Sequence, residues 1–146
     1  MTRARFVYPT FEQINWLYET MVFICDGGIK GYRDRGSLEY LLEIIKDDEY
    51  FPDLVSKLSR LIYGISRGHV FCDGNKRMGM IAGAYFLSIN GLYDPSYCYL
   101  QRMESITLHI ANGNIDEEFL PLIVRPLIQG KDYPEDVKLM LKEAIE

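Results

Sequence analysis

The sequence predicts a single all-α domain spanning residues 1–146. Apolar residues recur at helical spacing in most segments, and no part of the chain shows several clean period-2 strands. The clear interruption is GGIKGYRDR, residues 27–35, whose three glycines cannot support a stable helix. At 48% hydrophobic residues, the chain can bury a proper core. We therefore expect a helical bundle with one glycine-rich excursion, either a loop or a short β-hairpin.

The first three helices are predicted from capping signals and periodicity. Thr10 and Gln13 form a capping-box pattern, and it predicts a helix from about Phe11 to Ile24. A second helix begins at Ser37, after the glycines, and its apolar residues continue it to residue 45. The third helix is expected to open at Phe51-Pro52, with Pro52 in its first turn, and to end near Arg67.

The later helices follow the same periodicity. One begins near Asn75 and ends with Gly91 as the residue after its cap. Further helices are expected over 103–111, over 116–128 with prolines that kink or break it, and over 134–145. The element order is thus a run of helices joined by short connections, with no internal repeat or linker.

Composition and charge exclude several functional classes. The net charge of -5 and the pI of about 5.1 argue against generic nucleic-acid binding. The three cysteines form no C-x-x-C pair, and the N-terminus has no apolar signal core. The longest uncharged run, residues 78–93, is too short for a membrane span and indicates a buried helix. We therefore expect a reduced, cytoplasmic protein without nucleic-acid or membrane partners.

The stretch HVFCDGNKR, residues 69–77, crowds polar groups between two apolar helices. Its second half opens a helix, where unpaired N–H groups and a partial positive charge favour phosphate. Gly74 lets the backbone approach a ligand closely, and Asn75 can hydrogen-bond an oxygen. Lys76 and Arg77 add two cations. The sequence predicts a phosphate-binding site at these four residues.

Asp73 would repel phosphate unless a cation lies between them, and Mg²⁺ is commonly held by one or two carboxylates together with phosphates and water. His69 is the only nearby side chain suited to be a general base at neutral pH. Phe71 is expected to anchor the loop in the core. A lone His or a lone DGN has ordinary structural explanations, so the prediction depends on the ordered set.

That ordered set resembles the Fic/Doc family, whose core motif is H-x-F-x-D/E-G/A-N-G/K-R. It is matched without a gap by His69, Phe71, Asp73, Gly74, Asn75, Lys76 and Arg77. The segments GGIKGYRDRGSLEYLLEII and the apolar helix ending LSINGLY look like the flap and central helix of that family. The resemblance covers roughly residues 10–128 and implies a Fic/Doc-type helical bundle that uses ATP and Mg²⁺.

Two departures from the common Fic pattern are similar to the Doc branch ("death on curing" toxins). Lys76 stands where Fic enzymes have a second glycine, and Met80 stands at the final arginine position. Doc resemblance implies transfer of the γ-phosphate of ATP to a hydroxyl side chain of a target protein such as elongation factor Tu, which halts translation. Gly74 is the Fic-like choice, so AMP transfer remains an alternative. A non-catalytic anion-binding module is the other.

The resemblance also implies roles around the motif. His69 is expected to take the proton of the acceptor hydroxyl, and Asp73 to hold Mg²⁺. The flap is expected to dock an extended target segment, and it consists of Gly27, Gly28, Ile29, Lys30, Gly31 and Tyr32. No Glu has a Ser or Thr four positions before it, so the inhibitory S/T-x-x-x-E-G/N helix of the family is missing from this sequence. A separate antitoxin protein is therefore the expected partner.

Overall fold

The computed structural model describes residues 5–25 and 28–146, apart from the side chains of residues 93–98. Seven helices run through this described part: α1 (Phe11–Cys25), α2 (Arg35–Ile44), α3 (Leu54–Arg67), α4 (Asn75–Ile89), α5 (Tyr93–Ala111), α6 (Leu120–Ile128) and α7 (Glu135–Ile145). The described residues contain no strand, only an isolated antiparallel bridge between Tyr32 and Phe71. The predicted all-α class is confirmed.

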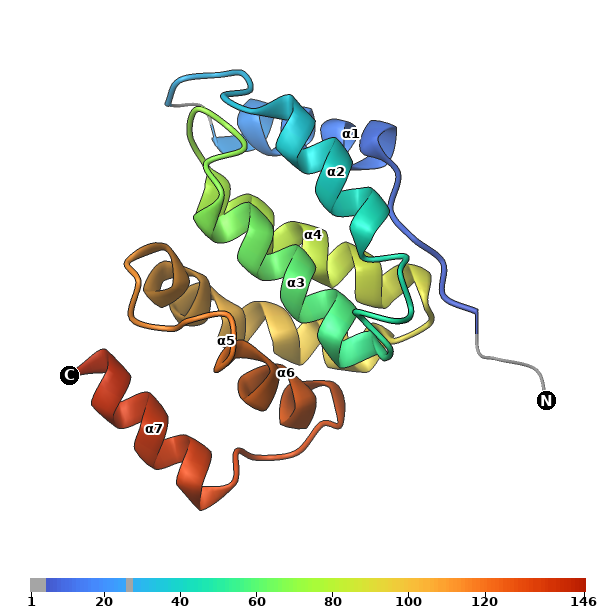
Figure 1. The fold of residues 1–146 in the computed structure, drawn as a ribbon. Coiled ribbons are helices and arrows are strands. Elements are labelled where there is room, and N and C mark those ends of the chain that lie inside the picture. Colours follow the sequence, from blue (N-terminus) through green and yellow to red (C-terminus); the bar gives the residue numbers. More distant parts are fainter. Residues whose placement is uncertain (1–4, 26–27) are drawn as a thin grey trace.

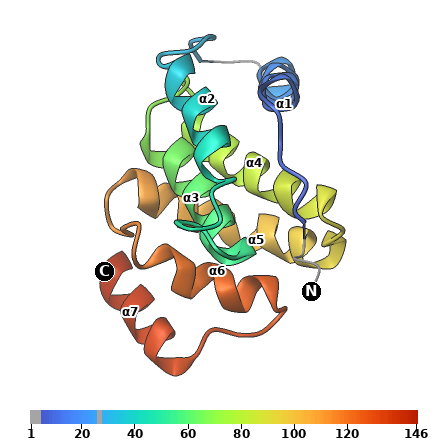
Figure 2. The same cartoon turned by 45° about the vertical axis from the view of Figure 1, so that its right-hand side comes forward.

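The helices are arranged around a central antiparallel pair, α3 and α4 (Figure 1). α1 and α2 pack on one side of this pair, whereas α5 and α6 pack on the other. α7 lies outermost, beyond α6, and the turned view in Figure 2 shows the same order of layers. No described helix is long and apolar enough to cross a membrane. The loop between α3 and α4 emerges at one end of the bundle, beside the connection from α1 to α2 (Figure 1).

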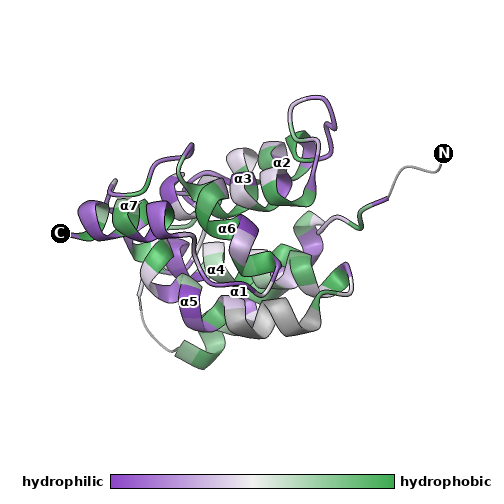
Figure 3. Ribbon diagram, turned by 90° about the horizontal axis from the view of Figure 1, so that it is seen from below, coloured by the Kyte–Doolittle hydropathy of each residue, from purple (hydrophilic) through white to green (hydrophobic). Residues whose placement is uncertain are grey.

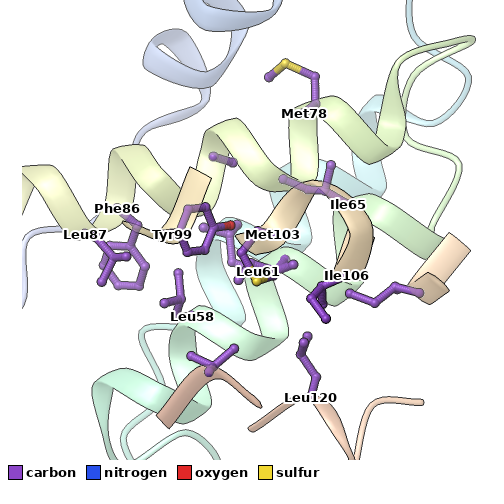
Figure 4. Close-up of a cluster of buried hydrophobic side chains, with 14 of the residues drawn as sticks. Leu58, Leu61, Ile65, Met78, Phe86, Leu87, Tyr99, Met103, Ile106 and Leu120 are labelled. Carbon is purple, nitrogen blue, oxygen red and sulfur yellow. The ribbon is translucent and has the colours of Figure 1, made fainter. Parts of the chain in front are cut away.

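The core lies where α3, α4, α5 and α6 meet (Figure 4). Leu61 of α3, Phe86 of α4 and Met103 of α5 are all fully buried there. Tyr99 is buried with them, and its hydroxyl donates to the Gly79 carbonyl at 3.5 Å. Burial raises the pKa of the Tyr99 phenol. In Figure 3, hydrophilic and hydrophobic residues alternate along α7, as expected of a helix with only one face on the core.

Several helix ends confirm the capping analysis. The Thr10 N–H donates to Gln13 Oε1 at 2.9 Å, and the Gln13 N–H donates to Thr10 Oγ1 at 3.2 Å, which completes the predicted capping box. α4 ends at Ile89, its cap is Asn90, and Gly91 follows with a φ of 80°. This left-handed glycine is the predicted C′ residue.

Other boundaries were predicted wrongly. α3 starts at Leu54 rather than at Phe51-Pro52, because the Asp53 carboxylate accepts from the Ser56 N–H at 2.8 Å and caps the helix there. α2 starts two residues before Ser37, since Asp34 is its cap.

The last two errors concern α5 and α6. α5 begins ten residues before the expected residue 103, and Pro95 is tolerated in its first turn because N–H groups there have no helical acceptor. α6 begins at Leu120 rather than at residue 116, since the Asp116 carboxylate forms a turn by accepting from the Phe119 N–H at 2.8 Å. Pro126 lies inside this short helix without ending it.

Candidate active site

The loop between α3 and α4, residues 68–74, is held by one buried aromatic side chain. Phe71 is fully buried, and its ring stacks on Tyr18 of α1 with centroids 4.2 Å apart. The ring of Tyr32 packs against Phe71 at 5.0 Å. Tyr18 is itself buried, so the loop is anchored to the inner face of α1. Such aromatic pairs stabilise beyond simple burial and orient the loop.

Asn75 closes the same loop from the start of α4. Its Oδ1 accepts from the Phe71 N–H at 2.9 Å, and its Nδ2 donates to the Phe71 carbonyl at 2.9 Å. The side-chain amide therefore serves the backbone of the loop. The backbone N–H of Asn75, at the first position of α4, has no acceptor within the helix.

Gly74 makes the sharp change of direction into α4. Its φ of 83° is left-handed, a conformation that glycine adopts without strain. An added Cβ would also lie 3.0 Å from Met21 Cε. The first helical hydrogen bond runs from the Met78 N–H to the Gly74 carbonyl at 2.8 Å. The N–H groups of residues 75–77 therefore remain at the helix start as donors for an anion.

Asp73 lies between this helix start and the flap. The side chain is exposed, and its Oδ1 accepts from the Gly74 N–H at 2.8 Å. Its Oδ2 faces Gly28 so closely that any Cβ at position 28 would collide with the carboxylate. Gly28 also has a φ of 85°. The sequence indicated both segments, but not that the flap backbone lies directly against the carboxylate.

The flap is tied to the motif loop and to α1 by hydrogen bonds. The Cys72 N–H donates to the Gly31 carbonyl, and the Arg33 N–H donates to the Val70 carbonyl, both at 2.9 Å. The Gly31 N–H donates to the Tyr18 hydroxyl at 2.8 Å. The described part of the flap is thus a loop that pairs with the motif loop, whereas Gly27 lies outside the described residues.

Tyr32 and Ile29 mark the inner and outer sides of the flap. The Tyr32 hydroxyl donates to Asn15 Oδ1 at 2.6 Å, and burial raises the pKa of this phenol to about 12. Ile29, in contrast, is 73% exposed, and Lys30 beside it is exposed too. Hydrogen bonds therefore hold the inner side of the flap in place, whereas the side chains of Ile29 and Lys30 are accessible to a ligand or a partner.

His69 has an unusual backbone conformation. Its φ is 52°, and it is the only non-glycine residue with positive φ in the described part of the chain. The left-handed region costs a residue with a side chain about 1–2 kcal/mol. The side chain is exposed, just before the buried pair Val70 and Phe71. Strain of this kind often accompanies functional loops, where neighbouring contacts maintain it.

A cleft of about 490 Å³ opens beside the start of α4. Its walls come from α1, the flap, the motif loop with α4, and α5. It is lined by Tyr18, Met21, Val22, Cys25, Ile29, Lys30, Asp73, Gly74, Lys76, Arg77, Met80, Glu104, Thr107 and Leu108. This volume falls in the range of small-molecule and cofactor sites. Lys30, Lys76 and Arg77 bring three cations to it, and Asp73 and Glu104 bring two carboxylates.

The cleft gathers six of the residues predicted from sequence and leaves out the others that the structure describes. Asp73, Gly74, Lys76 and Arg77 line it together with Ile29 and Lys30 of the flap. His69, Phe71 and Asn75 belong to the same loop but are not among the lining residues. The α5 wall, which comprises Glu104, Thr107 and Leu108, was missed. No sequence signal near these residues connects them to a motif almost thirty positions earlier.

The residues present fit a magnesium ion bound together with a phosphate ligand. No group of three His, Cys, Asp or Glu side chains gathers among the described residues, so an all-protein metal cage is not formed there. Mg²⁺ characteristically takes one or two carboxylates and completes its coordination with phosphate oxygens and water. Asp73 is an exposed carboxylate beside the helix start that would hold those phosphates.

Comparison with known proteins adds one finding. The Fic/DOC family model matches residues 9–87, more than half of the chain. The matched span runs from α1 through the flap and motif loop into the last turn of α4. No curated protein sequence matches the chain.

Proposed function

The chain belongs to the Fic/DOC family, whose members generally transfer nucleotide or phosphate groups to proteins, and we propose that it transfers the γ-phosphate of ATP to a hydroxyl side chain of a target protein. The observation that carries this proposal is the convergence of Asp73, Lys76 and Arg77 in one nucleotide-sized cleft at the start of α4. Phosphoryl transfer requires positioning and neutralisation of charge more than covalent chemistry by the protein. This cleft offers both.

In the proposed reaction, the hydroxyl oxygen of the target bonds to the γ-phosphorus of ATP while the bond from that phosphorus to the β,γ-bridging oxygen breaks, and ADP leaves. His69 accepts the hydroxyl proton as general base. The N–H groups at the start of α4, Lys76 and Arg77 hold the phosphates. Asp73 would hold Mg²⁺, which neutralises charge between this carboxylate and the phosphates.

Two residues of the cleft favour γ-phosphate transfer over AMP transfer. Lys76 lines it where the common Fic pattern has a glycine. Its charged side chain therefore occupies space that a glycine would leave open to phosphate. Met80 lines it one turn further along α4, at the position of the second Fic arginine. The cleft therefore lacks that guanidinium fork for the far end of a triphosphate. AMP transfer is the second candidate, and the Fic-like Gly74 favours it.

The target and a regulating partner are part of the proposal. We infer that the exposed flap docks an extended segment of the target and that the target is a translation factor such as elongation factor Tu, which places the reaction in the cytoplasm. We also infer a separate antitoxin. Trp16, Phe23 and Ile24 of α1 are between 63% and 87% exposed, and an apolar strip of this kind suits a partner helix.

Transfer of isotope from two labelled forms of ATP tests the reaction. Purified protein is incubated with Mg²⁺, a lysate rich in translation factors, and ATP labelled on either the α- or the γ-phosphate. Label from the γ-position alone, lost in His69→Ala, is the expected result. Label from the α-position would overturn phosphate transfer in favour of AMP transfer. No transfer from either form would favour a non-catalytic module of the same fold.

A further inference from the structure

The α5 wall of the cleft offers one polar group to a ligand. Thr107 is buried, and its hydroxyl donates to the carbonyls of Met103 and Glu104 at 3.0 and 3.2 Å. Leu108 contributes only hydrocarbon. Glu104 is exposed, and no hydrogen bond or ion pair of its side chain occurs among the described residues. The Glu104 carboxylate is therefore the acceptor that this wall presents.

The position of Glu104 follows from the helical hairpin. α5 returns antiparallel to α4 after the connection 90–92, and the two helices pack closely (Figure 1). Of the α5 residues in the cleft, Glu104 is therefore the farthest from the start of α4. Met80, another residue of the cleft, is about one helical turn, or roughly 5 Å, beyond Lys76 and Arg77 along α4.

The start of α4 and Glu104 consequently attract different groups of a ligand. At the start of α4, N–H groups, Lys76 and Arg77 attract phosphate. Met80 offers no charge to a ligand, and the Glu104 carboxylate repels any phosphate that comes near it. A carboxylate there suits a neutral ligand group that carries O–H or N–H donors, since an ionised carboxylate only accepts hydrogen bonds. A nucleoside has such donors in its sugar hydroxyls and in a base amino group.

We propose that Glu104 is a specificity-determining residue that accepts a hydrogen bond from the nucleoside part of the bound nucleotide and keeps the polyphosphate at the start of α4. This inference rests on the proposed function, because it takes ATP as the ligand. It adds a residue from α5, outside residues 9–87, to the recognition of that ligand. Glu104 thereby discriminates a nucleoside triphosphate from a bare polyphosphate.

Calorimetric titration of ATP and of inorganic triphosphate, both with Mg²⁺, tests the proposal. In the wild-type protein ATP should bind more tightly than triphosphate. Glu104→Gln keeps the size of the side chain and removes its charge. It should reduce the ratio of the dissociation constant for triphosphate to that for ATP at least fivefold. Glu118→Gln is the matched control, since it removes an exposed carboxylate that does not line the cleft. A ratio within twofold of wild type in Glu104→Gln would overturn the inference.

Analogues of ATP identify the donor. If Glu104 binds the sugar, wild type and Glu104→Gln should bind 2′,3′-dideoxy-ATP with the same affinity. If Glu104 binds the base, the two proteins should instead bind the triphosphate of purine riboside, which lacks the amino group, with the same affinity. If wild type binds both analogues more tightly than Glu104→Gln does, the hydrogen bond from the nucleoside to Glu104 is excluded. A wild-type protein that binds neither ATP nor triphosphate would refute the proposed function as well, whereas normal ATP binding with an unchanged ratio would refute only the role of Glu104.

Discussion

Replacement of Asn75 tests whether this residue holds the motif loop in place or binds phosphate. A residue that only binds phosphate can be removed without loss of stability, whereas one that holds the loop cannot. The Asn75 amide makes two hydrogen bonds of 2.9 Å to the backbone of Phe71. Each such bond contributes about 1 kcal/mol net, and removal leaves a partly buried N–H and carbonyl without partners. We expect Asn75→Ala to lower the free energy of unfolding by about 2 kcal/mol.

Asn75→Asp refines the test. The carboxylate still accepts from the Phe71 N–H but cannot donate to the Phe71 carbonyl, which it would face as a second acceptor. A negative charge in the first turn of α4 recovers about 0.5 kcal/mol through the helix dipole. The expected loss is therefore about 1 kcal/mol, half that of the alanine variant.

Urea unfolding followed by circular dichroism measures the free energy of unfolding of both variants. For a domain of this size, 2 kcal/mol corresponds to a fall in melting temperature of roughly 4–8 °C. Asn112→Ala is the control, because Asn112 is exposed and should change stability by less than about 0.5 kcal/mol. If Asn75→Ala unfolds like the wild type while phosphate binding is lost, Asn75 is a ligand residue and the structural reasoning is wrong.

Three further perturbations test the motif loop, the flap and a helix cap. His69→Gly should raise the free energy of unfolding by about 1 kcal/mol, because glycine adopts the φ of 52° without strain. The same variant should abolish transfer. If urea unfolding shows unchanged stability, His69 is not strained. Gly28→Ala should weaken Mg-ATP binding by about tenfold in calorimetry, since its Cβ would displace the Asp73 carboxylate, and equal affinity would argue against Asp73 as the magnesium ligand. Asp34→Asn tests pH dependence. Hydrogen bonds from the Ser37 hydroxyl and N–H hold the pKa of Asp34 below its ordinary 3.8, so its stabilising effect is present above that pH and is lost as the pH falls further. The difference in melting temperature between wild type and variant should therefore shrink in acid, and a constant difference would contradict the linkage.

Local signals in the sequence were reliable where the physics is local. The Thr10–Gln13 capping box and the left-handed Gly91 depend on residues a few positions apart, and both are confirmed. The start of α5 was missed because residues 93–102 include a proline that reads as a break unless it falls in the first turn. The start of α3 was misplaced since both Pro52 and Asp53 are plausible start signals, and the reciprocal bonds of Asp53 with Ser56 decide between them.

The sequence by itself determined the all-α class, and it marked the motif loop as the candidate site. Helical periodicity and the ordered residues 69–77 are contained within short stretches of chain, so they can be read without knowing the packing. The tertiary structure decided that the Asn75 amide turns onto Phe71, that Gly28 lies against Asp73, and that Glu104 faces the cleft. These contacts depend on how α1, α4 and α5 pack against one another, and burial of apolar side chains from distant segments sets that packing.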